Sequence, residues 1–129
     1  MVLDASGAVE FLLNTAAGKR LAARLADDTV VIHVPHLIDL EIAQVLRRYT
    51  RHGTLDAQVG ILALERWRSL GVQRYSHEPF LDRIWQLRDN VTAYDAIYVA
   101  LAEALSTVLF TGDRKLVGTP GVNAAVQLI

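Results

Sequence analysis

The sequence predicts a three-layer α/β/α domain with a mostly parallel central sheet of four to five strands. Short runs rich in β-branched residues alternate with longer helical patterns, which is typical of parallel strands joined by crossover helices. The 129 residues are 52% hydrophobic, enough for a real hydrophobic core. No repeat or low-complexity linker interrupts the pattern, so we expect a single domain over residues 1–129.

Five segments have the composition of short strands, and helical patterns fill the chain between them. The strands are expected at 1–5, 29–34, 72–76, 107–111 and 123–129. The helices are expected near 6–15, 19–27, 36–51, 54–69, 79–89, 93–105 and 113–117. Gly53 and Gly71 stand where helix C-caps belong, and Pro79 suits a first helical turn. Thr54 is expected to cap the second helix of a hairpin over 36–69.

Composition excludes several classes of protein. The absence of cysteine rules out disulfides and thiolate metal sites. A net charge of −1 gives no global basic field, so any nucleic acid must be met locally. Asp4 stands where a secretory signal would be positively charged, and no apolar run approaches the roughly 20 residues of a membrane span. We therefore expect a soluble, cytoplasmic protein.

Four carboxylates are expected at one edge of the sheet. Asp4 and Asp113 each follow a predicted strand, in "VLDAS" and "LFTGD". Asp95 opens the helix 93–105, and Glu41 lies a turn into the helix after the second strand. Ligand sites of open parallel sheets form beyond the carboxyl ends of the strands, where these residues belong.

Each acid also has a structural interpretation. Thr92 and Asp95 have the spacing of a capping box. Glu41 borders an apolar stripe, whereas Asp39 falls on the opposite side of the same helix. The stripe consists of Leu37, Ile38, Leu40, Ile42, Ala43, Val45 and Leu46. Four converging carboxylates would nevertheless repel one another, and a hard divalent cation removes that cost. Oxygen ligands without cysteine or a histidine pair favour Mg²⁺ or Mn²⁺ over Zn²⁺.

Such a cation can lower the pKa of a bound water and neutralise charge on a leaving oxygen, which is nuclease chemistry. A phosphoacceptor signalling domain would need an Asp ending the middle strand, but 72–76 has none. A haloacid-dehalogenase-type phosphatase would need an Asp at position 6, where Ser6 stands. A non-catalytic partner-binding domain, with the acids as helix caps, stays open as an alternative.

Four segments, in this order and spacing, resemble the PIN-domain ribonucleases and most closely the VapC toxins of bacterial VapBC toxin–antitoxin systems. They are "VLDAS", "LIDLEIAQVLRR", "RDNVTAYDAIYVALAEAL" and "LFTGDRKL". The resemblance implies a PIN-like fold and an RNA-cleaving toxin that uses Mg²⁺ or Mn²⁺. It implies an acidic quartet made of Asp4, Glu41, Asp95 and Asp113. It also places Ser6, Asn90 and Thr111 beside the quartet, where they would orient water or carboxylates.

The same resemblance implies a VapB-type antitoxin that blocks the acidic groove, and a homodimer. The hairpin 36–69 and the last helices are both candidates for the dimer face. Weaker candidates for RNA contacts are the basic residues near two of the acids, namely Arg47, Arg48, Arg51, Arg114 and Lys115. For the first three, a solvated helix end is the favoured interpretation. Trp67 and Trp85 are expected in the core or an interface, and Asp27, Asp28, Asp82 and Asp89 on the surface.

Overall fold

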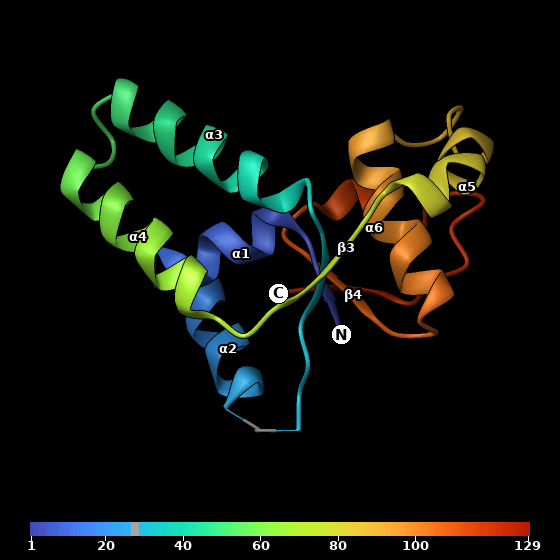
Figure 1. The fold of residues 1–129 in the computed structure, drawn as a ribbon, viewed down its shortest axis with the longest axis horizontal. Helices are drawn as coiled ribbons and strands as arrows, with labels where there is room; N and C mark the ends of the chain where they lie inside the picture. The colour runs from blue at the N-terminus through green and yellow to red at the C-terminus, as the bar shows by residue number, and fades with distance from the viewer. Residues whose placement is uncertain (27–28) are drawn as a thin grey trace.

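The computed structural model describes residues 1–26 and 29–129. These residues form one five-stranded sheet with helices on both faces (Figure 1). The strands are β1 (Val2–Leu3), β2 (His33–Pro35), β3 (Gln73–Tyr75), β4 (Leu109–Thr111) and β5 (Val126–Leu128). Their order is β3-β2-β1-β4-β5, and all four pairings are parallel. The predicted α/β class and strand number are therefore confirmed.

In the described residues, six α-helices lie between the strands. They are α1 (Ala5–Leu12), α2 (Ala16–Leu25), α3 (Ile38–Arg51), α4 (Ala57–Ser69), α5 (Leu81–Gln86) and α6 (Ala93–Ala104). Short 3₁₀ turns cover Glu78–Phe80 (η1) and Arg114–Leu116 (η2), and Pro79 stands in the first of these as expected. Helix α2 begins earlier than predicted because the Thr15 side chain caps it by accepting from Gly18 N. The predicted end of that helix and the surface positions of Asp27 and Asp28 fall outside the described residues.

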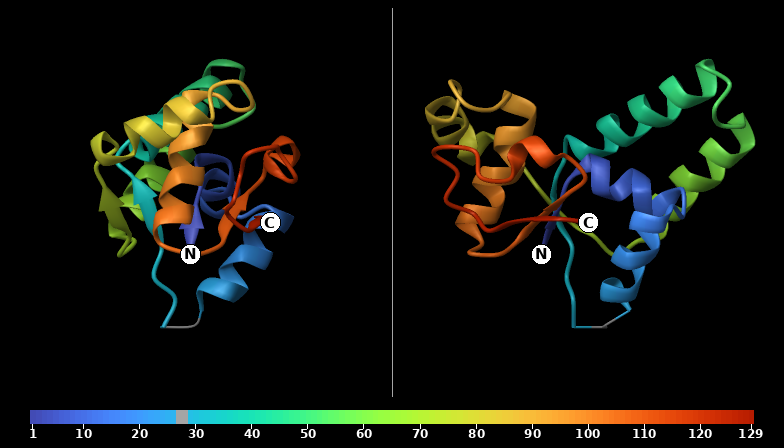
Figure 2. Two further views of the ribbon diagram at one scale, coloured as in Figure 1. Left: turned by 90° about the vertical axis from the view of Figure 1, so that its right-hand side faces the viewer. Right: turned by 180° about the vertical axis from the view of Figure 1, so that it is seen from behind.

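The sheet separates two groups of helices, as Figures 1 and 2 show. Helices α5 and α6 lie on one side, while α1, α2 and α4 lie on the other, and the α3–α4 hairpin projects beyond the sheet. The core is built on β1 and α6: Val2 and Leu3 are fully buried, and so is nearly every residue from Ala96 to Ala102. Among the described residues, no helix is both long and apolar enough to cross a membrane.

Two predicted helix caps differ from the structure. Thr54 does not cap α4; its hydroxyl donates to Tyr49 O at the end of α3, and Asp56 caps α4 by accepting from Gln58 N at 2.7 Å. Gly53 has a φ of +70° directly after α3, as a C-cap glycine should. Gly71 does not have a positive φ: α4 ends at Ser69, and its C-cap residue Leu70 already has extended backbone.

The apolar stripe on α3 is narrower than predicted. Ile38, Ile42 and Leu46 form the buried face, since residues four apart share one side of a helix. Leu40 lies off that face and is 72% exposed, so its assignment to the buried stripe was wrong. Asp39 does lie on another side from Glu41, but it has partners: its carboxylate accepts from Trp67 Nε1 at 2.6 Å and pairs with Arg74. Of the two tryptophans, Trp67 is in the core and Trp85 is 69% exposed.

Candidate active site

Asp4 is the buried centre of the site. It follows β1 directly and caps α1, with only 6% of the residue exposed. Its Oδ1 accepts from Ser6 Oγ at 2.6 Å and Gly7 N at 2.8 Å, and its Oδ2 accepts from Thr111 Oγ1 at 2.5 Å. Burial raises the pKa of Asp4, and the charge of Asp95 adds to this, although the three hydrogen bonds oppose the rise. The Asp4 carboxylate thus accepts three hydrogen bonds at a buried position where its negative charge is unfavourable.

Asp113 is joined to the same centre through β4. Thr111, which donates to Asp4, accepts from Asp113 N at 2.8 Å. The neighbouring Gly112 N donates to Ser6 Oγ at 2.7 Å, and a Cβ on Gly112 would lie 3.0 Å from that oxygen. The ends of β1 and β4 are therefore connected by two hydroxyl groups. This explains why Ser6 and Thr111 accompany the acids in the sequence.

Glu41 reaches the site from α3. The residue is half-buried, and its Oε2 accepts a hydrogen bond from the Tyr98 hydroxyl of α6. Burial raises the pKa of Glu41; the Tyr98 hydrogen bond opposes this, and the charges of Asp4 and Asp95 add to it. Burial and the Glu41 carboxylate raise the pKa of Tyr98 far above its ordinary value, so its hydroxyl is neutral and donates.

Asp95 stands in the first turn of α6, as the sequence predicts. Thr92 caps this helix: its Oγ1 accepts from Asp95 N at 3.1 Å and donates to Asp95 Oδ2 at 2.7 Å. The predicted helix start is confirmed, but the carboxylate accepts from the threonine hydroxyl in place of the reciprocal backbone contact of a capping box.

Three of the four acids influence one another electrostatically. The charge of Asp95 acts on both Asp4 and Glu41, and the charge of Asp4 acts on Glu41. Asp113 is attached by hydrogen bonds through Thr111. Within residues 1–26 and 29–129, no ion pair includes any of these four acids. The same residues contain no group of three or more Asp, Glu or His side chains arranged to hold a metal ion. The acids thus form an uncompensated cluster and not a closed ligand set.

The chemistry of this cluster fits a hard divalent cation. Every charged group in it is a carboxylate, and Mg²⁺ and Mn²⁺ prefer oxygen ligands. Burial raises the pKa of the Asp4 and Glu41 carboxyls, so a neighbouring cation would offset the cost that keeps their charge unfavourable. A full ligand set would require side-chain adjustment, because the carboxylates do not yet meet at one point.

The remaining predicted site residues are exposed. Asn90 is exposed, and its amide lies near Gly121: a Cβ there would be 3.4 Å from Asn90 Nδ2. Within the described part of the chain, Asn90 has no hydrogen bond to an acid, and its role stays a prediction. Arg114 and Lys115 are exposed in η2, directly after Asp113. The contact of Tyr98 with Glu41 was not predicted, because an aromatic residue in an apolar helix is ordinarily interpreted as a core residue.

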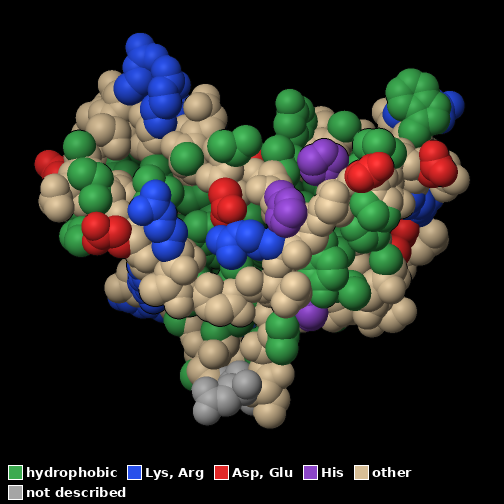
Figure 3. Space-filling view, viewed as in Figure 1, with side chains coloured by type: hydrophobic (Ala, Val, Ile, Leu, Met, Phe, Trp, Pro, Cys, Tyr) green, Lys and Arg blue, Asp and Glu red, His purple; other side chains and the backbone are tan. Residues whose placement is uncertain are grey.

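The predicted basic patch lies at the outer end of the α3–α4 hairpin. Arg47, Arg48 and Arg51 are exposed, and blue side chains gather over this tip in Figure 3. At 1.5 Å per residue they stand about 9–15 Å along α3 from Glu41. The patch is therefore not part of the acidic cluster, although a polynucleotide is long enough to span both.

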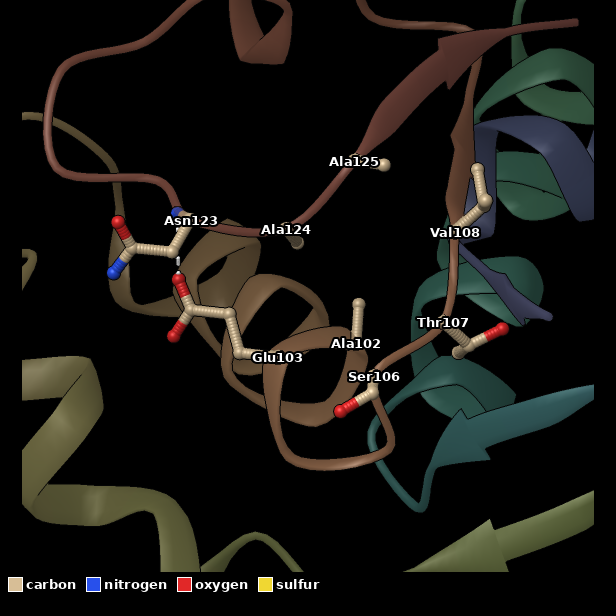
Figure 4. Close-up of a pocket in the computed structure, with 8 residues that line it drawn as sticks. All are labelled: Ala102, Glu103, Ser106, Thr107, Val108, Asn123, Ala124 and Ala125. Atoms are coloured by element: carbon tan, nitrogen blue, oxygen red, sulfur yellow. Dashed lines mark hydrogen bonds between the residues drawn. The ribbon is translucent and has the colours of Figure 1, made fainter.

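A separate hollow lies at the other end of β4. Figure 4 shows that Glu103, Asn123 and small side chains line it. The Glu103 carboxylate is already engaged, accepting from Asn123 N at 2.8 Å and pairing with Arg83 at 2.7 Å. The carboxylate that lines the hollow is therefore already paired, and the hollow is separate from the acidic cluster.

The fold and the acidic edge are those of a PIN-domain protein. Residues 1–121 match the family model described as PIN domain, and the chain belongs to this family. It is 43% identical to VapC ribonuclease Mb0985 from Mycobacterium bovis over all of this chain and 98% of that protein. It is 39% identical to ribonuclease VapC12 from Mycobacterium tuberculosis, with the same coverage. The chain is therefore a member of the VapC ribonucleases, the RNA-hydrolysing toxins of VapBC systems.

Solved structures agree on the fold. The crystal structure of PAE2754 from Pyrobaculum aerophilum has a TM-score of 0.72 and 23% identity, covering 97% of this chain and 81% of that one. The Mycobacterium tuberculosis toxin VapC20, described as cleaving the sarcin-ricin loop, has a TM-score of 0.64 and 13% identity, covering 88% of this chain and 89% of that one. PIN-domain ribonucleases generally depend on a divalent metal, in keeping with the carboxylate cluster.

Proposed function

We propose that this VapC-family chain hydrolyses RNA phosphodiester bonds with a water activated by Mg²⁺ or Mn²⁺, bound by Asp4, Glu41, Asp95 and Asp113. The observation that carries the proposal is the burial of Asp4 beside other carboxylates without a cationic side chain paired to any of them in the described residues. When bound, the divalent ion supplies a water of lowered pKa and offsets negative charge at the scissile phosphate.

The chain's own residues would prepare the carboxylates for this task. Ser6, Gly7 N and Thr111 fix both oxygens of Asp4, so that this side chain has one orientation. Thr92 donates to Oδ2 of Asp95 and so holds this carboxylate at the first turn of α6. Asp113 Oδ1 accepts from Lys115 N at 2.9 Å, which fixes the position of this carboxylate at the start of η2. Orientation of this kind reduces the rearrangement that hydrolysis requires.

Arg114 and Lys115 are the first candidates for phosphate contacts, because they are exposed and adjoin Asp113. Alanine at either position should weaken RNA binding and reduce its dependence on salt concentration, by about one unit of slope for each phosphate that is no longer neutralised. Alanine at Arg47, Arg48 or Arg51 should do the same only if the RNA extends along α3. Binding titrations at several salt concentrations would separate the two groups.

We also propose a VapB-type antitoxin as protein partner, a homodimer as the assembly and the cytoplasm as the location. An apolar groove beside Glu41, lined by Leu37, Leu40, Val45 and Tyr94 among others, is a surface on which the antitoxin could cover the acids. For the dimer, Leu62 on α4 and Leu81 on α5 represent the two predicted faces, since each is more than half exposed. Light scattering of Leu62→Asp and Leu81→Asp would show which face associates.

The decisive experiment is cleavage of defined RNAs in Mg²⁺, Mn²⁺ or EDTA, with and without the antitoxin. Asp4→Ala and Asp95→Ala should abolish cleavage in folded protein, whereas Asp82→Ala, which removes an exposed acid from α5, should leave it unchanged. Cleavage that survives EDTA, or both site substitutions, would contradict the mechanism. A folded protein that binds antitoxin but cleaves no RNA would favour the non-catalytic alternative.

A further inference from the structure

We infer that Tyr98 is a positioning residue for the metal site: its hydroxyl holds Glu41 Oε2, so that Oε1 is the oxygen presented to the cation. The inference deepens the proposed function and rests on it. Its basis is the hydrogen bond between two residues 57 positions apart in the sequence, one on α6 and one on α3.

The Tyr98 hydroxyl has a fixed position because its ring belongs to the core. The residue is 2% exposed and packs among the buried residues of α6. Tyr98 also follows Asp95 by three positions, and residues at this spacing lie on the same side of a helix. One helix thus provides both a candidate ligand, Asp95, and the donor that holds a second candidate ligand, Glu41.

Glu41 needs such a donor more than the other acids do. Its side chain has three rotatable bonds, and it enters the site from α3 and not from a strand end. The Tyr98 hydroxyl provides the hydrogen bond observed for its carboxylate within the described residues. Asp4 has two hydroxyl donors and Asp95 has one, so each of these three acids is held by a hydroxyl. For Glu41, that hydroxyl belongs to a buried aromatic residue.

Tyr98→Phe tests this assignment, because phenylalanine keeps the ring and removes only the hydroxyl. Tyr75→Phe is the matched control: the Tyr75 hydroxyl is hydrogen-bonded to His33 Nδ1 at 2.9 Å, and neither residue belongs to the acidic cluster. Binding of Mn²⁺ to the full chain, followed by the electron paramagnetic resonance of free Mn²⁺, should weaken about tenfold in Tyr98→Phe, as is typical when a partner of a metal ligand is removed. Binding should be unchanged in Tyr75→Phe.

Two further measurements separate positioning from a general structural effect. RNA cleavage by Tyr98→Phe should fall at limiting Mn²⁺ and recover at saturating Mn²⁺, with KM for the RNA unchanged. In a Glu41→Ala background, adding Tyr98→Phe should cause no further loss of Mn²⁺ affinity, because the two residues act as one unit. Thermal unfolding of each variant would confirm that the compared proteins are folded.

The outcomes distinguish this inference from the proposed function. Unchanged Mn²⁺ affinity in folded Tyr98→Phe, with wild-type binding intact, would overturn the role of Tyr98 and leave the proposed mechanism standing. An equal loss in the presence and absence of Glu41 would overturn it as well, since Tyr98 would then act through another group. If the wild-type chain binds no Mn²⁺, both the proposed metal site and the role of Tyr98 are wrong.

Discussion

The hydroxyl of Thr111 donates to Asp4 Oδ2 at 2.5 Å, which joins a residue at the end of β4 to one at the end of β1. The two residues are 107 positions apart, and both are buried. The same oxygen of Thr111 accepts from Asp113 N at 2.8 Å. The Thr111 hydroxyl thus contacts two candidate ligands: it donates to the side chain of Asp4 and accepts from the backbone N–H of Asp113.

Thr111→Val should therefore impair the site more than the fold. Valine has nearly the same shape, but it leaves Asp4 Oδ2 and Asp113 N without a partner, which should cost about 1–3 kcal/mol in the free energy of unfolding. RNA cleavage should fall at least about tenfold, because a carboxylate that has lost its orienting partner binds metal less well. Thr54→Val is a suitable control, since it removes an exposed hydroxyl bonded to Tyr49 O at the hairpin turn. Equal cleavage by the two variants would contradict the role of Thr111.

Neutralising Asp4 should stabilise the metal-free protein at neutral pH while abolishing cleavage. Because burial raises the pKa of Asp4, the folded state binds a proton more tightly than the unfolded state does. The resulting stability is present below about pH 4 and is lost as the pH rises through the higher folded pKa. Glu41 contributes with the same sign.

Asp4→Asn replaces the buried carboxylate with a neutral amide, so the folded state no longer contains this unfavourable charge at pH 7. The midpoint of thermal unfolding of the variant at pH 7 should therefore exceed that of the wild type by about 2–5 °C. The difference should disappear near pH 4. Calorimetry in EDTA across this range would measure it. A variant less stable than the wild type at pH 7 would mean that the hydrogen bonds to the carboxylate outweigh the cost of its burial.

The sequence was most informative about the acids that stand next to strand ends and helix starts. Asp4, Asp95 and Asp113 were predicted correctly relative to β1, α6 and β4, because the strand-to-helix alternation determines where a parallel sheet places its carboxyl ends. Tyr98 could not be found in this way. Its distinguishing feature is a contact between α6 and α3, and no local pattern reports which aromatic hydroxyl in a buried helix meets a carboxylate.

The surface of α3 was harder to predict than its length. Leu40 has the composition of a core residue, but periodicity alone does not show how far the core extends around a projecting helix. The exposed Leu40 lines the apolar groove beside Glu41 and does not belong to the core. Asp39 was separated correctly from Glu41, although its partner Arg74 comes from a strand 35 residues away and could not be inferred.

The Asp39–Arg74 pair should show the opposite pH dependence to Asp4. Burial alone would raise the pKa of Asp39, but hydrogen bonds from Arg74 and Trp67 outweigh it and lower the pKa. The pair therefore contributes stability above about pH 4 and loses it as the pH falls. Both side chains are partly exposed, so Asp39→Asn should cost no more than about 1 kcal/mol at pH 7. Urea unfolding at pH 7 and pH 3 should show the cost at the higher pH alone; an equal cost at both would assign it to packing.

Gly112 should be difficult to replace by alanine without disturbing the acids. A Cβ at this position would lie 3.0 Å from Ser6 Oγ, the atom that also accepts from Gly112 N and donates to Asp4. Gly112→Ala should displace Ser6 and reduce RNA cleavage about tenfold or more, since small displacements of orienting groups are costly in catalysis. Gly71→Ala is the control, because a Cβ at position 71 would meet no atom within 4 Å and the φ there is not positive. That variant should cleave RNA as the wild type does. If Gly112→Ala did so too, the Ser6 hydroxyl would not be needed to orient Asp4.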